Sequence, residues 1–258
     1  MELKNNDAVS HSRREFGNLW ASQSLIRDWA SHPEWRSRDV LPCLYISLST
    51  ERKSTPRVQN SPKLGNTIRA RNIFLRGFAR DLLVEPKYVY PLITKFSDKL
   101  DEILRQSPKT TEQAIGDAAF AYYIFERIHP FLDGNGRIGR MIVKRILKEA
   151  GIRDPIFHDQ RWYGGNRSPH LDSLERVNKT NNLAHLELFL AKALINRYDP
   201  LNEQQKHLEI ADIIQQKSLE AQESVKGKKL SDIWDGFSGI PIRGNYVSQT
   251  TALQPITS

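Results

Sequence analysis

The strongest constraint on the fold is a pair of helical patterns joined by a short polar loop. In residues 109–128, apolar side chains recur at helical spacing, and Thr110 with Gln113 matches a helix-capping signature. A second pattern runs from Gly136 to Ala150, and Gly151 is suited to end that helix. The small, aromatic and aliphatic side chains of the first pattern predict a central, largely buried helix. We therefore expect a mainly α fold.

The rest of the chain adds further helical patterns and two segments that favour β structure. The helical patterns cover residues 13–30, 90–104, 171–178, 183–198 and 203–224. The segment Asp39–Leu48 is a continuous apolar run and is a candidate strand. Residues 67–86 mix basic and β-favouring residues about an Arg-Gly pair, which predicts a small hairpin.

The amino-acid composition limits the classes of function that this chain can have. The chain has 258 residues, with 38 Lys and Arg against 30 Asp and Glu, a formal net charge of +8 that suits an anionic partner. The single cysteine, Cys43, excludes an intramolecular disulfide framework and a thiolate zinc cluster. No apolar stretch is long enough to span a bilayer, and no signal-peptide pattern opens the sequence. We expect a cytoplasmic protein, and export as a secreted effector stays open.

The loop between the two central patterns reads HPFLDGNGRIGR, from His129 to Arg140. Two glycines flank an asparagine, so that successive backbone N–H groups can turn inward as a nest. The first turn of the following helix adds unpaired N–H groups and the positive end of its dipole. Arg137 and Arg140, three residues apart, lie on the same helical face and can both reach an anion held there. The pattern predicts a polyphosphate site.

Three more side chains of this loop are candidates for a role. Asp133 suits Mg²⁺, which is usually held by one or two carboxylates together with phosphate oxygens. His129 is a candidate base because imidazoles titrate near neutral pH, and Phe131 is expected to anchor the loop in the core. Each feature alone has a commoner structural explanation. Together in one short loop they indicate attack of a hydroxyl on a nucleotide phosphate.

These residues resemble the signature of the Fic family, His-x-Phe-x-(Asp/Glu)-Gly-Asn-Gly-Arg-x-x-Arg, at every fixed position. A looser similarity extends over residues 67–198. The resemblance implies a Fic-type helical bundle with a small β-hairpin flap, formed by Thr67–Pro86, on which a target protein docks. It also implies Mg²⁺-dependent transfer of AMP from ATP to a Tyr, Thr or Ser hydroxyl of that protein, with release of pyrophosphate.

The resemblance also implies roles for the residues that perform the chemistry. His129 would be the base that deprotonates the target hydroxyl. Phe131 would anchor the loop, and Asp133 would hold a Mg²⁺ ion that bridges the α- and β-phosphates.

The phosphate-binding residues are implied in the same way. Gly134, Asn135 and Gly136 would form the nest, with Arg137 on the β-phosphate and Arg140 on the γ-phosphate. The phosphorylating members of the family, the Doc type, carry lysine at the position of Gly136, so nucleotidyl transfer is favoured over kinase chemistry.

The resemblance, together with a shift in composition after Pro200, divides the chain into four parts. We expect the catalytic domain at residues 61–200, after an N-terminal extension of helix and strand at residues 1–60. A peripheral helix would occupy residues 201–230, and a loosely ordered tail residues 231–258.

Regulation is left open by the sequence. Many family members are inhibited by a glutamate within (Ser/Thr)-x-x-x-Glu-(Gly/Asn), which pairs with the second arginine of the signature. Glu51 follows Ser47 at the right distance but precedes Arg52, and Glu209 lacks the serine. Inhibition by a separate antitoxin chain, or no inhibition at all, is also compatible with the sequence.

Two other functions compete with AMP transfer. The same site could use another nucleotide donor or remove AMP. The chain could instead be a non-enzymatic helical module whose basic hairpin binds a nucleic acid or an acidic protein, with steep salt dependence. That module would depend on Arg69, Arg71, Arg76 and Arg80, and His129 would be dispensable.

Overall fold

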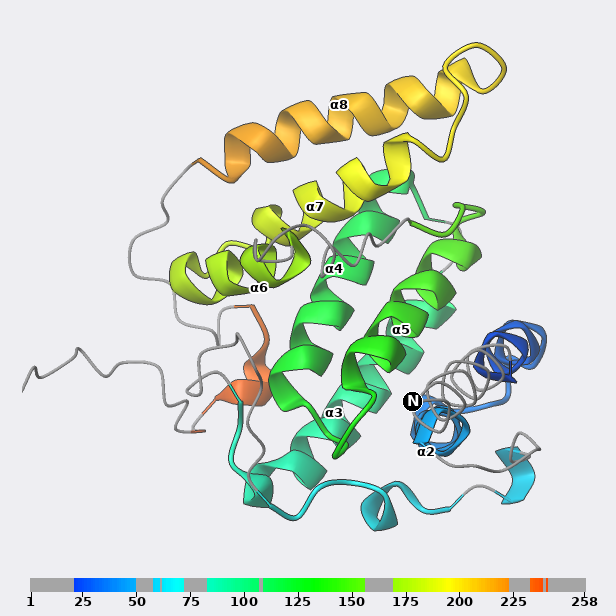
Figure 1. Cartoon of the computed structure of the whole chain (residues 1–258), viewed down its shortest axis with the longest axis vertical. Helices are drawn as coiled ribbons and strands as arrows, with labels where there is room; N and C mark the ends of the chain where they lie inside the picture. The colour runs from blue at the N-terminus through cyan, green and yellow to red at the C-terminus, as the bar shows by residue number, and fades with distance from the viewer. Residues whose placement is uncertain are drawn as a thin grey trace, which may run out of the picture.

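A computed structural model shows the protein to be mainly helical (Figure 1). It describes residues 21–49, 58–60, 62–71, 83–106, 109–155, 169–222, 233–238 and 240. No strand occurs within these ranges. None of the helices found there is long and apolar enough to cross a membrane.

The two central helices predicted from the sequence are confirmed as α4, Thr111–Ile128, and α5, Asn135–Glu149, which lie side by side (Figure 1). The capping box is also confirmed. The Thr110 hydroxyl accepts a hydrogen bond from the Gln113 backbone N–H at 3.1 Å, and the Gln113 side chain accepts one from the Thr110 N–H at 3.0 Å. At the other end of the pair, Gly151 has a φ of +67°, a value that favours glycine where a helix stops.

Residues before α4 add a further helical layer. Residues 21–31 are helical, and α3 spans Pro86–Arg105. Single 3₁₀ turns occur at Val58–Asn60 (η1) and Leu64–Asn66 (η2).

The strand predicted at Asp39–Leu48 is wrong, because Ser37–Ser49 forms the helix α2. The buried side chains Val40, Leu41, Leu44 and Leu48 recur at helical rather than alternating spacing. A short apolar run with Pro42 in it does not distinguish a buried helix from a buried strand by its pattern alone.

Contacts with α3 position the start of α2. The Asp101 carboxylate of α3 accepts hydrogen bonds from the backbone N–H of Ser37, at 2.8 Å, and from its hydroxyl, at 2.5 Å. These bonds satisfy a donor at the first residue of α2 that has no partner within the helix.

The predicted hairpin at Thr67–Pro86 is not shown. Its central residues, 72–82, lie outside the described ranges, and the residues described on either side of them contain no strand. The N-terminal part of this segment instead contacts the loop after α4, since the Arg69 N–H donates to the Pro130 carbonyl at 2.8 Å.

The last part of the chain packs three helices against α4. They are α6, Pro169–Thr180, α7, Ala184–Ile195, and α8, Gln204–Glu220, with α8 outermost (Figure 1). Beyond them, the 3₁₀ turn η6, Asp235–Phe237, contacts α3 and buries Trp234 and Phe237. The two aromatic side chains of this short piece are packed in the core.

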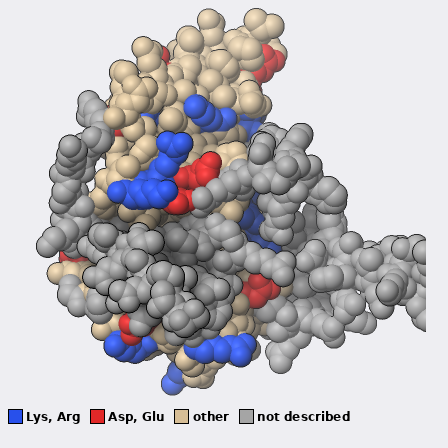
Figure 2. Space-filling view, turned by 60° about the vertical axis from the view of Figure 1, so that its left-hand side comes forward, with Lys and Arg blue, Asp and Glu red and all other residues tan. Residues whose placement is uncertain are grey.

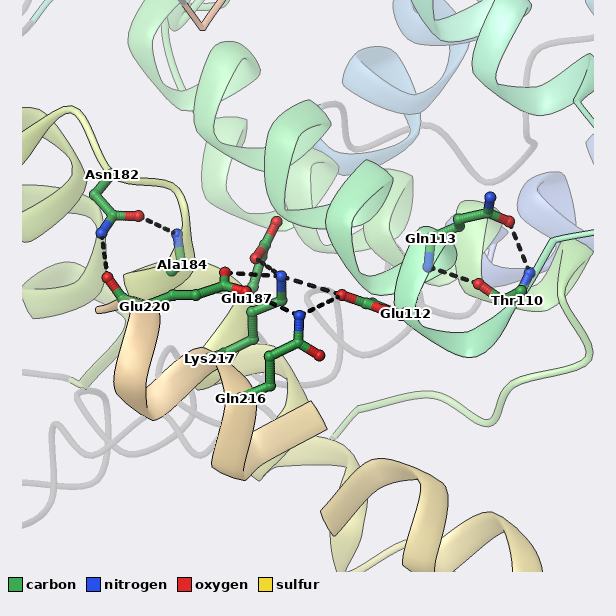
Figure 3. A network of polar contacts seen from close by, with 9 residues as sticks. All are labelled: Thr110, Glu112, Gln113, Asn182, Ala184, Glu187, Gln216, Lys217 and Glu220. Carbon is green, nitrogen blue, oxygen red and sulfur yellow. Dashed lines mark hydrogen bonds and ion pairs between the residues drawn. The ribbon is translucent and has the colours of Figure 1, made fainter. Parts of the chain in front are cut away.

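Lys217 of α8 connects three helices through carboxylates (Figure 3). Its Nζ lies 3.1 Å from Glu187 of α7, 3.3 Å from Glu112 of α4 and 2.9 Å from Glu220 of α8. Burial alone would lower the pKa of Lys217, but the hydrogen bonds and charges of these carboxylates raise it well above its usual value. Burial also raises the pKa of Glu187, against the opposing effect of Lys217. The lysine therefore compensates a carboxylate that is largely removed from water.

Replacement of Lys217 by Met should lower the free energy of unfolding by on the order of 3 kcal/mol, because Glu187 would keep its charge in the interior without a partner. Urea denaturation would measure the loss. Lys179→Met is the matched control. Its lysine pairs with Glu175 at 2.8 Å but is 68% exposed, and such pairs contribute less than about 1 kcal/mol. Equal losses for the two variants would contradict this reading of the network.

Candidate functional site

The loop between α4 and α5 begins at His129, which is only 7% exposed. His129 caps the C-terminus of α4, and its N–H donates to the Phe125 carbonyl at 2.8 Å. Its φ of 47° and ψ of 62° are left-handed, a conformation that residues other than glycine adopt at a cost. A residue held there requires support from its surroundings, and strained residues of this kind cluster at functional sites.

Arg69 supplies part of that support and is the partner that the sequence did not reveal. Its side chain is buried, and its Nε donates to the His129 carbonyl at 2.8 Å. One terminal nitrogen donates to the carbonyls of Ile128, at 3.2 Å, and Val84, at 2.6 Å. Burial lowers the pKa of Arg69 to about 10, which still leaves it protonated at neutral pH. A positive charge therefore meets the C-terminal carbonyls of α4, where it is favourable.

Two residues fix the middle of the loop from inside. Phe131 is fully buried and stacks on Tyr45 of α2, with ring centroids 4.6 Å apart and planes 6° from parallel. Asn135, at the first position of α5, accepts from the Phe131 N–H at 3.0 Å and donates to the Phe131 carbonyl at 2.8 Å. The amide of Asn135 thus closes the loop, and only its backbone is available for an anion.

The first turn of α5 lies beside Asp133 and the side chains of Arg137 and Arg140. Gly134 precedes it with a φ of 78° and ψ of 1°, which a side chain would strain. Asp133 is 80% exposed, and its Oδ2 lies 3.0 Å from a guanidinium nitrogen of Arg137. A Cβ atom at Gly136 would lie 3.5 Å from a guanidinium nitrogen of Arg140, so Arg140 passes over this same turn. The structure thus brings together both arginines, the carboxylate and the backbone turn that the sequence singled out.

Two further residues near His129 also escaped the sequence analysis. Glu126 is buried on α4, with its Oε2 3.4 Å from His129 Nδ1. Gly139 of α5 faces it, since a Cβ there would lie only 2.8 Å from Glu126 Oε1. A glutamate in the last turn of an amphipathic helix gives no local signal of burial, and the partner glycine lies on another helix.

Of the two candidate inhibitory glutamates, Glu209 is in the wrong place. Its carboxylate pairs with Lys206 at 2.6 Å, and Lys206 in turn donates to Thr111 at the N-terminus of α4. His129 is at the opposite end of this helix of 18 residues, about 27 Å away. Glu51 lies outside the described residues.

One of the four arginines on which the alternative basic interaction module would depend is buried. Arg69 is buried against backbone carbonyls and cannot contact a nucleic acid, whereas Arg71 is exposed and Arg76 and Arg80 lie outside the described ranges. On the face shown in Figure 2, the coloured Lys and Arg side chains form separate groups with Asp and Glu among them. The described part of this face is therefore not a continuous basic surface.

Known proteins show similarity to this region. Residues 57–147 match the family model described as Fic/DOC family. A probable protein adenylyltransferase of Aquifex aeolicus is 48% identical over 40 residues, 16% of this chain and 12% of that protein. The protein adenylyltransferase Fic of Drosophila yakuba is 33% identical over 63 residues, 24% of this chain and 13% of its own length. The chain thus covers only about an eighth of these two relatives.

Structural comparison extends the similarity to most of the fold. A Fic domain containing signaling protein from Bacteroides thetaiotaomicron superposes with a TM-score of 0.50 at 19% sequence identity. The superposition covers 84% of this chain and 74% of that protein. At 19% sequence identity, the match shows similarity of the fold only.

Proposed function

Because residues 57–147 match the Fic/DOC family model, we propose that the protein is a protein adenylyltransferase. It transfers AMP from ATP to a Tyr, Thr or Ser hydroxyl of another protein and releases pyrophosphate. The observation that carries the proposal is the loop from His129 to Arg140, which combines a buried histidine with a helix N-terminus and two arginines. The relatives named protein adenylyltransferase support the same reaction.

In the proposed reaction, His129 takes the proton from the target hydroxyl while the hydroxyl oxygen attacks the α-phosphorus of ATP. A P–O bond forms to that oxygen as the bond between the α-phosphorus and the bridging oxygen breaks. The electron pair leaves with pyrophosphate. A positioned general base contributes about 10²–10⁴-fold to such a step.

The phosphates would be held by the first turn of α5. Backbone N–H groups at Gly134, Asn135 and Gly136, with the helix dipole, favour an anion at this position. Arg137 would contact the β-phosphate and Arg140 the γ-phosphate, where guanidinium groups match phosphate oxygens in pairs. Charge that builds up on the leaving pyrophosphate would thus be met by donors already in place.

The residues present fit Mg²⁺ rather than a metal with an all-protein set of ligands. The described residues contain no group of three or more His, Cys, Asp or Glu that could hold a metal ion. Asp133 offers one exposed carboxylate at the phosphate site, and Mg²⁺ is commonly bound by one or two carboxylates, phosphate oxygens and water. When bound, the ion would neutralise charge on the phosphates.

Asp133→Asn should raise the Mg²⁺ concentration needed for half-maximal transfer several-fold, because one charged ligand becomes a neutral oxygen. Titration of activity with MgCl₂ at saturating ATP measures the change. Asp98→Asn is a suitable control, since its carboxylate is also exposed but lies on α3. An unchanged Mg²⁺ requirement for Asp133→Asn would mean that Asp133 is not a ligand.

The proposal is tested by determining which phosphate of ATP is transferred to protein. The full chain is incubated with a cell lysate and ATP labelled at either the α- or the γ-phosphate. AMP transfer labels target proteins from the α-position only, whereas a kinase labels them from the γ-position only. Parallel incubations with UTP or GTP labelled at the α-phosphate, or with labelled CDP-choline, test other donors. Absence of protein label from every donor would reject nucleotidyl transfer. That the target docks on residues 67–86 stays a prediction.

A further inference from the structure

Glu126 is a buried carboxylate that the proposed reaction does not use. It lies on α4, one helical turn before His129, and the two side chains are 11% and 9% exposed. Its Oε2 is 3.4 Å from the Nδ1 of His129. Among the described residues, neither His129 Nδ1 nor Glu126 Oε1 has a hydrogen-bond partner. Buried polar atoms are nearly always paired, so an unpaired imidazole nitrogen 3.4 Å from a buried carboxylate points to a contact that tightens elsewhere in the reaction cycle.

The helix interface is shaped to accommodate this carboxylate. A Cβ atom at Gly139 of α5 would lie 2.8 Å from Glu126 Oε1 and 2.8 Å from the Cε2 atom of Tyr122. Any larger residue at this position would therefore push the carboxylate or the ring aside. Among the ion pairs of the described residues, Glu126 is paired with His129, and Arg140 Nη1 and Glu126 Oε1 both lie within 4 Å of the position that a Cβ atom at Gly136 would take.

We propose that Glu126 positions His129 for proton transfer, an inference that rests on the proposed function. The Glu126 carboxylate accepts the Nδ1–H of the imidazole and so holds the neutral ring in one tautomer. Nε2 is then left without a proton and is the atom that accepts one from the target hydroxyl. The partner of one ring nitrogen commonly decides the state of the other in this way.

The distance between Glu126 Oε2 and His129 Nδ1 is compatible with an active site to which no substrate is bound. At 3.4 Å, the two atoms are slightly beyond the usual range of a hydrogen bond. Catalytic hydrogen bonds are often long before substrates bind and shorten in the complex. The backbone of His129 is already fixed from the other side, because Arg69 holds its carbonyl at 2.8 Å.

Kinetics supply the first test. Glu126→Gln keeps the size of the side chain but removes the charge, and it should lower kcat by about 10- to 100-fold. The KM for ATP should stay within about twofold, since Glu126 does not contact the phosphates in the proposed reaction. Glu112→Gln is the control on the same helix, with a side chain that is 46% exposed, and should keep the parent kcat. An unchanged kcat in Glu126→Gln, or a loss that appears only in KM, would overturn the proposal.

Nuclear magnetic resonance supplies a test that needs neither ATP nor a target. Nitrogen-15 spectra of the full chain at mildly alkaline pH report which imidazole nitrogen carries the proton. The signal of His129, one of 7 histidines, is identified by its loss in His129→Ala. We expect the Nδ1–H tautomer in the parent and a mixture in Glu126→Ala. The Nε2–H tautomer in the parent, or no change in Glu126→Ala, would reject the pairing.

The two tests separate this inference from the proposed function. If the protein transfers no AMP, the tautomer of His129 still shows whether Glu126 holds it. Gly139→Ala offers a variant that leaves both side chains chemically intact. Crowding of the carboxylate should shift the tautomer in the same direction as Glu126→Ala. An unshifted tautomer in folded Gly139→Ala would count against the pairing.

Discussion

Replacement of His129 by Ala is expected to reduce AMP transfer by about 10²–10⁴-fold, because the base that deprotonates the target hydroxyl is lost. ATP binding should change little, since the proposed phosphate contacts come from α5 and its N-terminus. Label incorporation into protein measures the first quantity, and calorimetric titration with ATP the second.

The control for this experiment is His207→Ala, which removes an imidazole from α8. It should transfer AMP at the parent rate. A folded His129→Ala protein that incorporates as much label as the control would mean that His129 is not the base. Loss of ATP affinity together with activity would instead assign His129 to nucleotide binding.

Replacement of Arg69 by Ala is expected to lower both stability and transfer. The guanidinium donates to the carbonyls of His129, Ile128 and Val84 in the interior, and its loss would leave these acceptors without a partner. Hydrogen bonds from a charged group contribute about 1.5–3 kcal/mol each, and bonds made by one group are not additive, so a loss of roughly 3–5 kcal/mol is expected for the set. Urea denaturation measures the loss.

Activity should also fall in Arg69→Ala under conditions where it is folded, because the left-handed backbone of His129 loses its external support. Arg71→Ala is the matched control, an exposed arginine two residues along the chain, for which a change within about 0.5 kcal/mol is expected. Arg69→Lys should recover little, since an ammonium group cannot reproduce the fork of donors. If Arg69→Ala and Arg71→Ala were equally stable and active, the support assigned to Arg69 would be wrong.

Local patterns in the sequence were sufficient for the two central helices. The capping box at Thr110 and the glycine at position 151 act through their immediate neighbours, and the structure confirms both. The matching of residues 57–147 to the Fic/DOC family confirms the resemblance that this loop suggested.

Long-range contacts account for what the sequence did not reveal. Arg69 reads as a surface charge in a basic segment, and only its pairing with a carbonyl 60 residues away shows it to be internal. The burial of Glu126 depends on a glycine of the neighbouring helix. The segment Asp39–Leu48 is a helix whose buried side chains pack against α3 and α5. None of these facts is contained in the spacing of nearby residues.

The hydrogen bond between Arg69 and His129 also shows that the twelve-residue motif depends on a contact from outside itself. A fragment containing only α4, the loop and α5 would include every residue of the signature. It would nevertheless lack the guanidinium that holds the backbone of its histidine, which comes from a separate part of the chain. Closing such a distant contact costs chain entropy and is slow compared with helix formation. The helices can therefore form before the site does, and competence for catalysis is a property of the assembled domain.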